Sequence, residues 1–145
     1  MTHGRVIAQK ITSLQRCIVR AREELATAGA DFGNNFSRHD AAVLNVIRAC
    51  ATTIDLANIL IRKRKLGIPT ESRESFQILT REKLLDRNLA DRLKRMVGFR
   101  NLAVHQYREL DLGIVESVIR NNLDDLAGFA VSIRTKLNES PSGSN

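Results

Sequence analysis

Four stretches of this chain place apolar residues at every third or fourth position, and this spacing constrains the fold more than any other feature of the sequence. In the first stretch, residues 5–28, the steps are four, three, four, three and four, which puts the apolar residues on one face of an α-helix. These residues are Ile7, Ile11, Leu14, Ile18, Ala21 and Leu25. The whole chain has only two prolines and eight glycines, too few for the many turns of a β-sandwich or barrel. We therefore predict an all-α protein.

The second stretch is predicted to be the central helix. Ser37, followed three residues later by Asp40, resembles a helix N-cap with its reciprocal acid, so we expect the helix to begin there. Basic residues 62–65 favour the C-terminus of a helix, and Gly67 and Pro69 follow them as stop signals. Its apolar face is widened by alanines and consists of Val43, Ile47, Ala51, Ile54, Ala57 and Ile61.

Two further helices complete the predicted bundle, one from about residue 88 and one from Asp111, a residue suited to the N-cap position. A shorter helical turn over residues 75–79 places Phe76 and Leu79 inward. We predict an up-and-down bundle of four to five helices in a single domain over residues 1–138. Residues 139–145 are small and polar and are expected to form a flexible tail. The apolar positions of the two long helices are Leu89, Leu93, Met96, Ala103, Val115, Ile119, Leu123, Leu126, Ala130, Ile133 and Leu137.

Net charge, aromatic content, apolar runs and cysteines restrict the partners that this chain can bind and the compartment in which we expect it. The 145 residues include 23 Lys and Arg against 16 Asp and Glu, a net charge of +7, which favours polyanionic partners such as nucleic acid. Six aromatic residues and no tryptophan provide little for base stacking. No run of 18 apolar residues and no apolar signal core occurs, so we expect no membrane association. Cys17 and Cys50 fit no motif spacing and are expected to be buried free thiols in a reducing cytoplasm.

Residues 96–107 break the helical pattern and form the candidate site. Gly98 lies inside a predicted helix, where it costs about 1 kcal/mol relative to alanine; close approach of a partner helix or a ligand would explain it. Arg100, Asn101, His105 and Tyr107 place polar side chains at the end of an otherwise apolar helix. On a continuous helix His105 lies about 140° from Arg100. The two side chains can meet one phosphate only if the helix ends or bends there, or if a second copy of the chain completes the site.

These residue types suit RNA cleavage without a metal ion. A histidine can take the proton from a ribose 2′-hydroxyl or return one to the departing 5′-oxygen. A guanidinium can hold the phosphate and stabilise its developing charge. From spacing alone, an arginine and a histidine near a helix end more often serve as a capping and surface-charge device than as a catalytic pair. His3 and His39 have no companions that would complete a ligand set, and we expect both to be exposed.

The motif resembles that of a known family. Residues 98–101 (Gly-Phe-Arg-Asn) and 104–107 (Val-His-Gln-Tyr) resemble the R-N-x-x-V-H-x-Y signature of HEPN-domain proteins, and among them of the HepT toxins. Residues 54–58 (Ile-Asp-Leu-Ala-Asn) resemble the central-helix segment of that family. The resemblance spans roughly residues 40–111. Three further positions fit the stretch that connects these segments in the family: Pro69, Phe76 and Leu79.

The resemblance implies a helical homodimer with a ribonuclease site in the cleft between protomers. It implies the toxin of a two-gene module, whose antitoxin is a minimal nucleotidyltransferase of the MntA type. Arg100 and His105 would be the catalytic pair. By its own chemistry, Asn101 suits a supporting role, because its amide can orient the imidazole or donate to a phosphate oxygen. Tyr107 would accept AMP from ATP through the antitoxin, and each added phosphate would bring bulk and negative charge to the RNA site. Transesterification to a 2′,3′-cyclic phosphate requires no ion, so we expect neither a metal nor a cofactor.

The local charge agrees with an RNA substrate, in messenger or transfer form. Residues 81–108 contain eight basic and three acidic side chains. Lys94 and Arg95 lie within two turns of Arg100 and can follow an RNA backbone; a solvated helix face would explain them equally well. Two alternative functions stay open. One is a non-catalytic companion subunit of a nucleotidyltransferase, and the other is a helical RNA-binding module that does not cleave.

Overall fold

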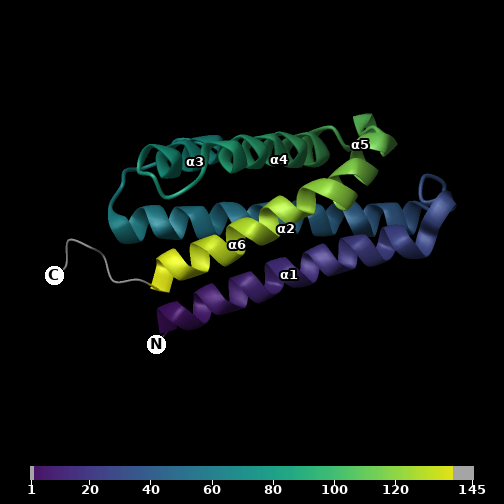
Figure 1. Ribbon diagram of the computed structural model, residues 1–145. Coiled ribbons are helices and arrows are strands. Elements are labelled where there is room, and N and C mark those ends of the chain that lie inside the picture. Colours follow the sequence, from purple (N-terminus) through teal and green to yellow (C-terminus); the bar gives the residue numbers. More distant parts are fainter. Residues whose placement is uncertain (1, 139–145) are drawn as a thin grey trace.

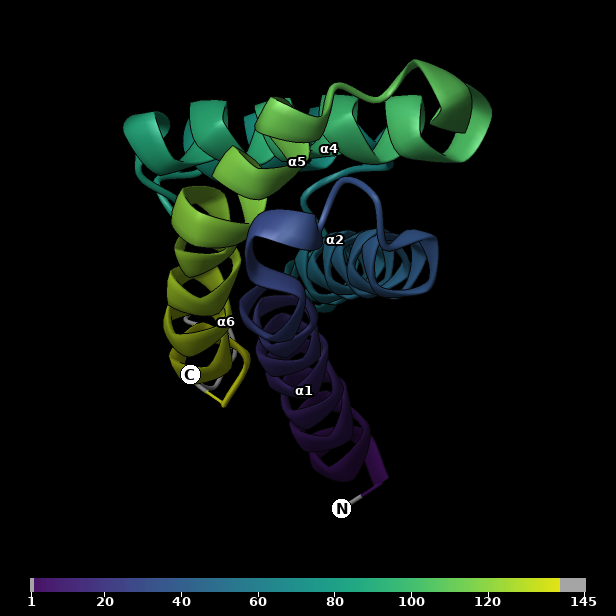
Figure 2. The same cartoon turned by 90° about the vertical axis from the view of Figure 1, so that its right-hand side faces the viewer.

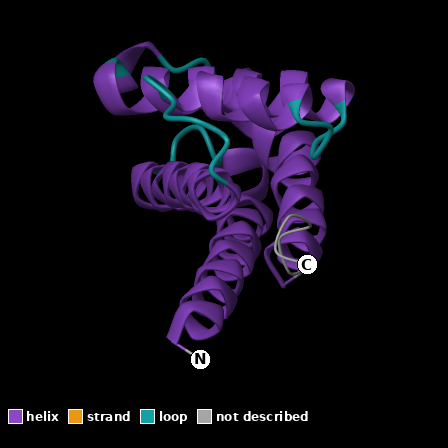
Figure 3. Cartoon of the chain, turned by 90° about the vertical axis from the view of Figure 1, so that its left-hand side faces the viewer, coloured by secondary structure: helices purple, strands orange, loops and turns teal. Residues whose placement is uncertain are grey.

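A computed structural model describes residues 2–138 of the chain (Figure 1). Every secondary-structure element in that range is a helix or a helical turn, which confirms the predicted all-α class (Figure 3). In chain order the elements are α1 (Thr2–Ala28), the 3-10 turn η1 (Gly29–Asp31), α2 (Phe36–Arg64), α3 (Ser72–Arg81), α4 (Arg87–His105), the 3-10 turn η2 (Tyr107–Glu109), α5 (Leu112–Ser117), the π-helical turn η3 (Val118–Asn122) and α6 (Leu123–Asn138).

The bundle is up-and-down, as predicted. Successive long helices run in alternating directions, and α5, η3 and α6 continue one another without a break as a single C-terminal helix (Figure 1). Seen from the side, α4 lies across the top of the molecule and α1, α2 and α6 lie beneath it (Figure 2). The start of α1 and the end of α6 share one end of the molecule. The start of α2, the end of α4 and α5 gather at the opposite end (Figure 1).

Helix α2 is the centre of the bundle, because it packs against α1, α3, α4 and α6. Among the described helices it alone is long and apolar enough to cross a membrane by length and composition. However, 56% of its most apolar window is buried inside the protein, which is what a core helix requires. Its buried positions are Ala42, Val43, Asn45, Val46, Ala49, Cys50, Thr53, Ile54, Leu56, Ala57, Ile59, Leu60 and Ile61.

The start of α2 differs from the prediction, whereas its end agrees. The N-cap is Asn35 and not Ser37: the Asn35 side chain accepts a hydrogen bond of 3.2 Å from the backbone N–H of Arg38. Asp40 therefore does not take part in the cap. Its side chain instead accepts a hydrogen bond from Tyr107, which follows α4. At the other end Lys65 adopts a left-handed conformation with φ 57°, and α2 stops before Gly67.

The remaining helices begin close to the expected residues. Asp86 caps α4 by accepting a hydrogen bond of 3.1 Å from the backbone N–H of Leu89. Asp111 caps α5 in the same way through Ile114, as predicted. α3 is longer than the expected turn and covers Ser72–Arg81. The predicted flexible tail, 139–145, lies outside the described residues.

Candidate active site

The helix that carries the motif ends directly after the histidine. The α-helical conformation continues through Arg100 to His105, and the backbone N–H of Gln106 donates the last helical hydrogen bond, 2.8 Å, to the carbonyl of Leu102. Gln106 then leaves the helix with φ −138° and ψ 49°, and Tyr107 starts a 3-10 turn. Since the bend comes after His105, it does not reduce the angle of about 140° between Arg100 and His105 in one chain.

Arg100 is half-buried and has an incomplete set of hydrogen bonds. Its Nη1 donates to Oδ1 of Asn101 over 3.1 Å. Its Nε is buried and has no hydrogen-bond partner among the residues that the structure describes. Buried polar groups in native proteins are nearly always paired, and an unpaired one costs about 1–3 kcal/mol. The side chains of the two predicted site residues Arg100 and Asn101 are thus in contact. The Nε–H of Arg100 remains an unused donor.

The guanidinium of Arg100 lies close enough to Cys50 on α2 to act on its ionisation. Burial raises the pKa of the Cys50 thiol from 9.0 to about 12, and the positive charge of Arg100 opposes this rise. Cys50 is 2% exposed, and its Sγ donates to the carbonyl of Met96 over 3.8 Å. A thiol that stays protonated is no nucleophile. The prediction of buried free thiols is confirmed for Cys50 and for Cys17.

His105 lies on the surface at the C-terminal end of α4. Its side chain is exposed to solvent. Large apolar side chains are exposed in the same region of the fold. They are Val104 (48%), Tyr107 (37%), Leu112 (40%) and Ile114 (51%), together with Phe36 (75%) on the first turn of α2.

Tyr107 turns back from η2 onto the start of α2. Its hydroxyl donates a hydrogen bond to Oδ1 of Asp40. Nδ1 of His39 lies 2.9 Å from the same hydroxyl oxygen, and the two rings are 6.0 Å apart between centroids. Partial burial, the hydrogen bond to Asp40 and the negative charge of Asp40 all raise the pKa of Tyr107 above its ordinary value. Hence the hydroxyl is a protonated, firmly held group at neutral pH.

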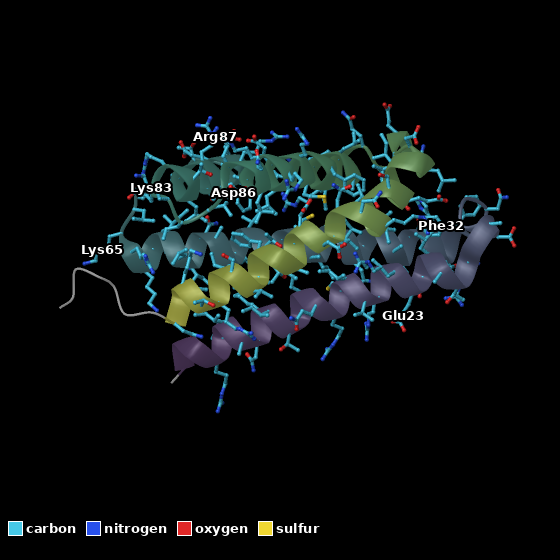
Figure 4. All side chains as sticks on the ribbon, in the orientation of Figure 1. Glu23, Phe32, Lys65, Lys83, Asp86 and Arg87 are labelled. Atoms are coloured by element: carbon cyan, nitrogen blue, oxygen red, sulfur yellow. The ribbon has the colours of Figure 1, made fainter. Side chains whose placement is uncertain are left out.

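The expectation of an exposed His39 is wrong. Its side chain is 16% exposed, and its ring packs at 5.1 Å and 48° against Phe32, a buried residue at the end of the molecule opposite the termini (Figure 4). The sequence offered no signal for the contact between His39 and Tyr107, because these two residues are 68 positions apart. The side chain of His3 lies outside the described residues.

A side chain of α3 approaches Gly98 closely. A methyl group on Gly98 would lie 2.8 Å from Nη2 of Arg73, which reaches over from α3. Arg73 therefore places a guanidinium on α4 about one turn before Asn101. The sequence analysis did not select Arg73 as a site residue. The unusual glycine was the signal that something approaches α4 at this point.

The two predicted RNA-binding residues, Lys94 and Arg95, lie nearer the start of α4, within two turns before Arg100. Nζ of Lys94 is 3.9 Å from Oδ1 of Asp91, and Arg95 is exposed. Lys94 also lines a surface groove of about 500 Å³ between α3 and α4, which it shares with Arg81 and Arg87. No group of three or more His, Cys, Asp or Glu side chains that could hold a metal ion occurs in the part of the chain that the structure describes.

Known proteins resemble this chain over most of its length. The family described as "Ribonuclease HepT-like" matches residues 14–133. The mRNA nuclease HepT of Shewanella oneidensis is 40% identical over 131 residues, which are 90% of this chain and 98% of that protein.

Solved structures agree with this match. One contains the tri-AMPylated HEPN toxin of Shewanella oneidensis in complex with its MNT antitoxin; it has a TM-score of 0.84 and 40% identity and covers 90% of this chain and 97% of that one. Another is a toxin–antitoxin structure with AMP-PNP, with a TM-score of 0.85, 40% identity and coverage of 90% and 98%.

Proposed function

This chain belongs to the HepT-like ribonuclease family, and from that premise we propose that it is the toxin of a toxin–antitoxin module and an endoribonuclease. Its relative in Shewanella oneidensis is named as an mRNA nuclease and has been solved as a toxin bound to an antitoxin. The similarity covers nearly the whole of both chains, so a shared activity is the simplest interpretation.

The observation that carries the proposal is the match to the ribonuclease family over residues 14–133, and the Arg100 guanidinium is the group of the candidate site that best suits a phosphate. Its buried Nε has no partner within the described residues, although burying an unpaired donor is unfavourable. A phosphate oxygen is the acceptor that best fits a guanidinium, in charge and in geometry. Asn101 contacts the same guanidinium and so helps to hold it in place.

The chemistry that these groups support is transesterification. The imidazole of His105 takes the proton of a ribose 2′-hydroxyl, whose oxygen attacks the adjacent phosphorus. The bond from phosphorus to the 5′-oxygen breaks, that oxygen receives the proton that the imidazole of His105 has taken up, and a 2′,3′-cyclic phosphate remains. Arg100 stabilises the charge that develops on the non-bridging oxygens. The side chains alone perform each step, so the proposal includes neither a metal nor a cofactor.

We propose that the active form is a homodimer. Arg100 and His105 diverge by about 140° within one chain, whereas a two-fold symmetric pair can present the arginine of one protomer to the histidine of the other. The exposed apolar side chains near His105, among them Val104 and Ile114, support an interface at this end of the bundle, since clustered exposed apolar residues often mark contact surfaces.

Tyr107 is proposed as the residue that the antitoxin, a minimal nucleotidyltransferase of the MntA type, modifies with AMP. The relative's tri-AMPylated state shows that such a toxin accepts AMP, and Tyr107 is the only tyrosine of this chain. It lies two residues after His105 and is 37% exposed. AMP at this position would add negative charge beside the proposed phosphate site and so repel RNA.

Lys94 and Arg95 are proposed to follow the RNA backbone beyond the cleaved bond. Both project from the helix that carries Arg100, and the groove beside Lys94 holds two more arginines. We also propose that residues 1–138 form one domain. The proposed location is the cytoplasm, where RNA is available and where Cys17 and Cys50 stay reduced.

The test is RNA cleavage by purified protein together with growth arrest on expression without the antitoxin. Arg100→Ala and His105→Ala should each reduce cleavage at least about a hundredfold and abolish the arrest, with unchanged circular dichroism. If the wild type cuts no RNA while Tyr107 still accepts AMP, the chain is a non-catalytic companion subunit. If the wild type only retards RNA, with steep salt dependence and no effect of His105→Ala, it is an RNA-binding module.

A further inference from the structure

We propose that Asp40 and His39 act directly in the AMPylation of Tyr107, Asp40 as the acceptor of its phenolic proton and His39 as a donor to its phenolic oxygen. This inference rests on the proposed function of Tyr107 as the AMP acceptor. It assigns the toxin's own side chains a part in the reaction by which its antitoxin neutralises it.

The direction of the hydrogen bonds follows from the groups themselves. An ionised carboxylate only accepts, so the single hydroxyl proton of Tyr107 is donated to Asp40. With that proton committed, the short contact of 2.9 Å from Nδ1 of His39 to the hydroxyl oxygen requires the Nδ1–H tautomer as donor. The phenolic oxygen thus has a proton acceptor on one side and a proton donor on the other.

Packing holds the His39 side chain in this arrangement. His39 is 16% exposed and lies against Phe32, so its ring has a defined place at the start of α2. Its Nδ1 is also 3.7 Å from Oδ1 of Asp40. Asp40 itself is 62% exposed, which lets it release a proton to water after receiving it.

Tyr107 needs a proton acceptor because its surroundings make ionisation of the hydroxyl less favourable. Partial burial and the contact with Asp40 raise its pKa, so phenolate is scarce at neutral pH. Attack by the neutral phenol requires that the proton leave as the new bond forms, and a positioned base supplies this step.

The reaction balances with ATP, supplied with the antitoxin, as the second reactant. The phenolic oxygen of Tyr107 forms a bond to the α-phosphorus of ATP. The bond from that phosphorus to the oxygen bridging to the β-phosphate breaks, and pyrophosphate leaves with the bonding electrons. The phenolic proton passes to Asp40, while His39 donates to the oxygen as negative charge develops on it.

The alternative is that the hydrogen bond between Tyr107 and Asp40 only attaches η2 to α2 and that Asp40 takes no part in the reaction. An amide tests this directly, because the Oδ1 of asparagine accepts a hydrogen bond but cannot hold the transferred proton. Asp40→Asn would therefore keep the hydrogen bond that attaches η2 to α2 but remove the group that accepts the phenolic proton. Asp31→Asn is the matched control, since it removes one negative charge from the neighbouring turn η1.

The experiment measures the rate at which full-length toxin variants receive AMP from ATP in the presence of the antitoxin, with Tyr107 identified by peptide mass spectrometry. Asp40→Asn should slow the transfer at least about tenfold, Asp40→Glu should recover part of the rate, and Asp31→Asn should match the wild type. His39→Ala should slow the transfer more than His39→Asn, whose side-chain N–H can replace the Nδ1 donor.

A second measurement is independent of the antitoxin. Because the chain has one tyrosine and no tryptophan, its tyrosinate absorbance reports on Tyr107 alone. Asp40→Asn should lower the pKa of Tyr107, because it removes the negative charge that opposes ionisation. Asp40→Asn with the wild-type transfer rate, or with an unchanged tyrosinate titration, overturns the inference alone. Wild-type toxin that receives no AMP on Tyr107 overturns the proposed modification itself.

Discussion

The hydroxyl of Tyr107 donates a hydrogen bond to the carboxylate of Asp40, although 67 residues separate the two along the chain. This bond joins the turn that follows the motif helix to the start of the central helix. Tyr107 follows His105 by two residues, so a group added to Tyr107 would lie next to the end of α4. If Tyr107 is modified as proposed, the added group would therefore lie close to the proposed RNA site.

Arg100 should contribute to activity at the expense of stability. Replacing it with methionine removes the buried, unpaired Nε, whose cost is about 1–3 kcal/mol, and keeps most of the apolar volume. Arg100→Met should abolish RNA cleavage while leaving the free energy of unfolding unchanged or higher, as measured by urea denaturation at fixed protein concentration.

The matched control is Arg92→Met on the same helix. Arg92 pairs with Asp125 over 3.0 Å, and its loss leaves that half-buried carboxylate without its partner, so stability should fall by about 1 kcal/mol. A larger loss for Arg100→Met than for Arg92→Met would show that the guanidinium is fully satisfied in the native protein.

Two inactive variants should restore activity when mixed. In a shared cleft, a chain carrying Arg100→Ala still supplies His105, and a chain carrying His105→Ala still supplies Arg100. Random exchange between symmetric dimers should recover about a quarter of the wild-type cleavage rate. The measurement is RNA cleavage after the variants are unfolded and refolded together, with each variant refolded alone as the control. No recovery would place both groups of each site in one protomer.

The protein should lose stability at alkaline pH. The Cys50 pKa rises from 9.0 to about 12 on folding, and that of Tyr107 rises as well. A group that is harder to ionise in the folded state makes the unfolded state lose its proton first, so the free energy of unfolding decreases as pH rises above about 9. Cys50→Ala should reduce this slope between pH 9 and pH 11 in denaturation curves. An unchanged slope would mean that the thiol is not buried in solution.

Gly98→Ala should change stability in a direction set by Arg73. Alanine gains about 1 kcal/mol of helix propensity over glycine, but its methyl group would lie 2.8 Å from Nη2 of Arg73. That atom ends a flexible side chain, so we expect a net gain of less than about 1 kcal/mol in thermal denaturation. The same substitution in an Arg73→Ala background should show the full gain. A net loss for Gly98→Ala would mean that Arg73 is held rigidly on α4.

Sequence reasoning recovered the elements better than the contacts between them. Asp111 was correctly predicted as an N-cap, because a cap depends on residues three positions away. Asp40 was interpreted as part of a cap at Ser37, whereas Asn35 performs that role and Asp40 binds Tyr107. An acid near the start of a helix suits either purpose, and only the position of a distant side chain distinguishes them.

The apolar spacing alone determined that the chain is a helical bundle with α2 at its centre, and the motif of Arg100, His105 and Tyr107 indicated the family. These are local properties, because helix periodicity and capping act over a few residues. The tertiary structure decided that Arg100 lies near Cys50, that the guanidinium of Arg73 approaches Gly98, and that His39 and Asp40 contact the Tyr107 hydroxyl. Such contacts depend on how the helices pack, and side chains far apart in the chain meet only once the whole bundle has formed.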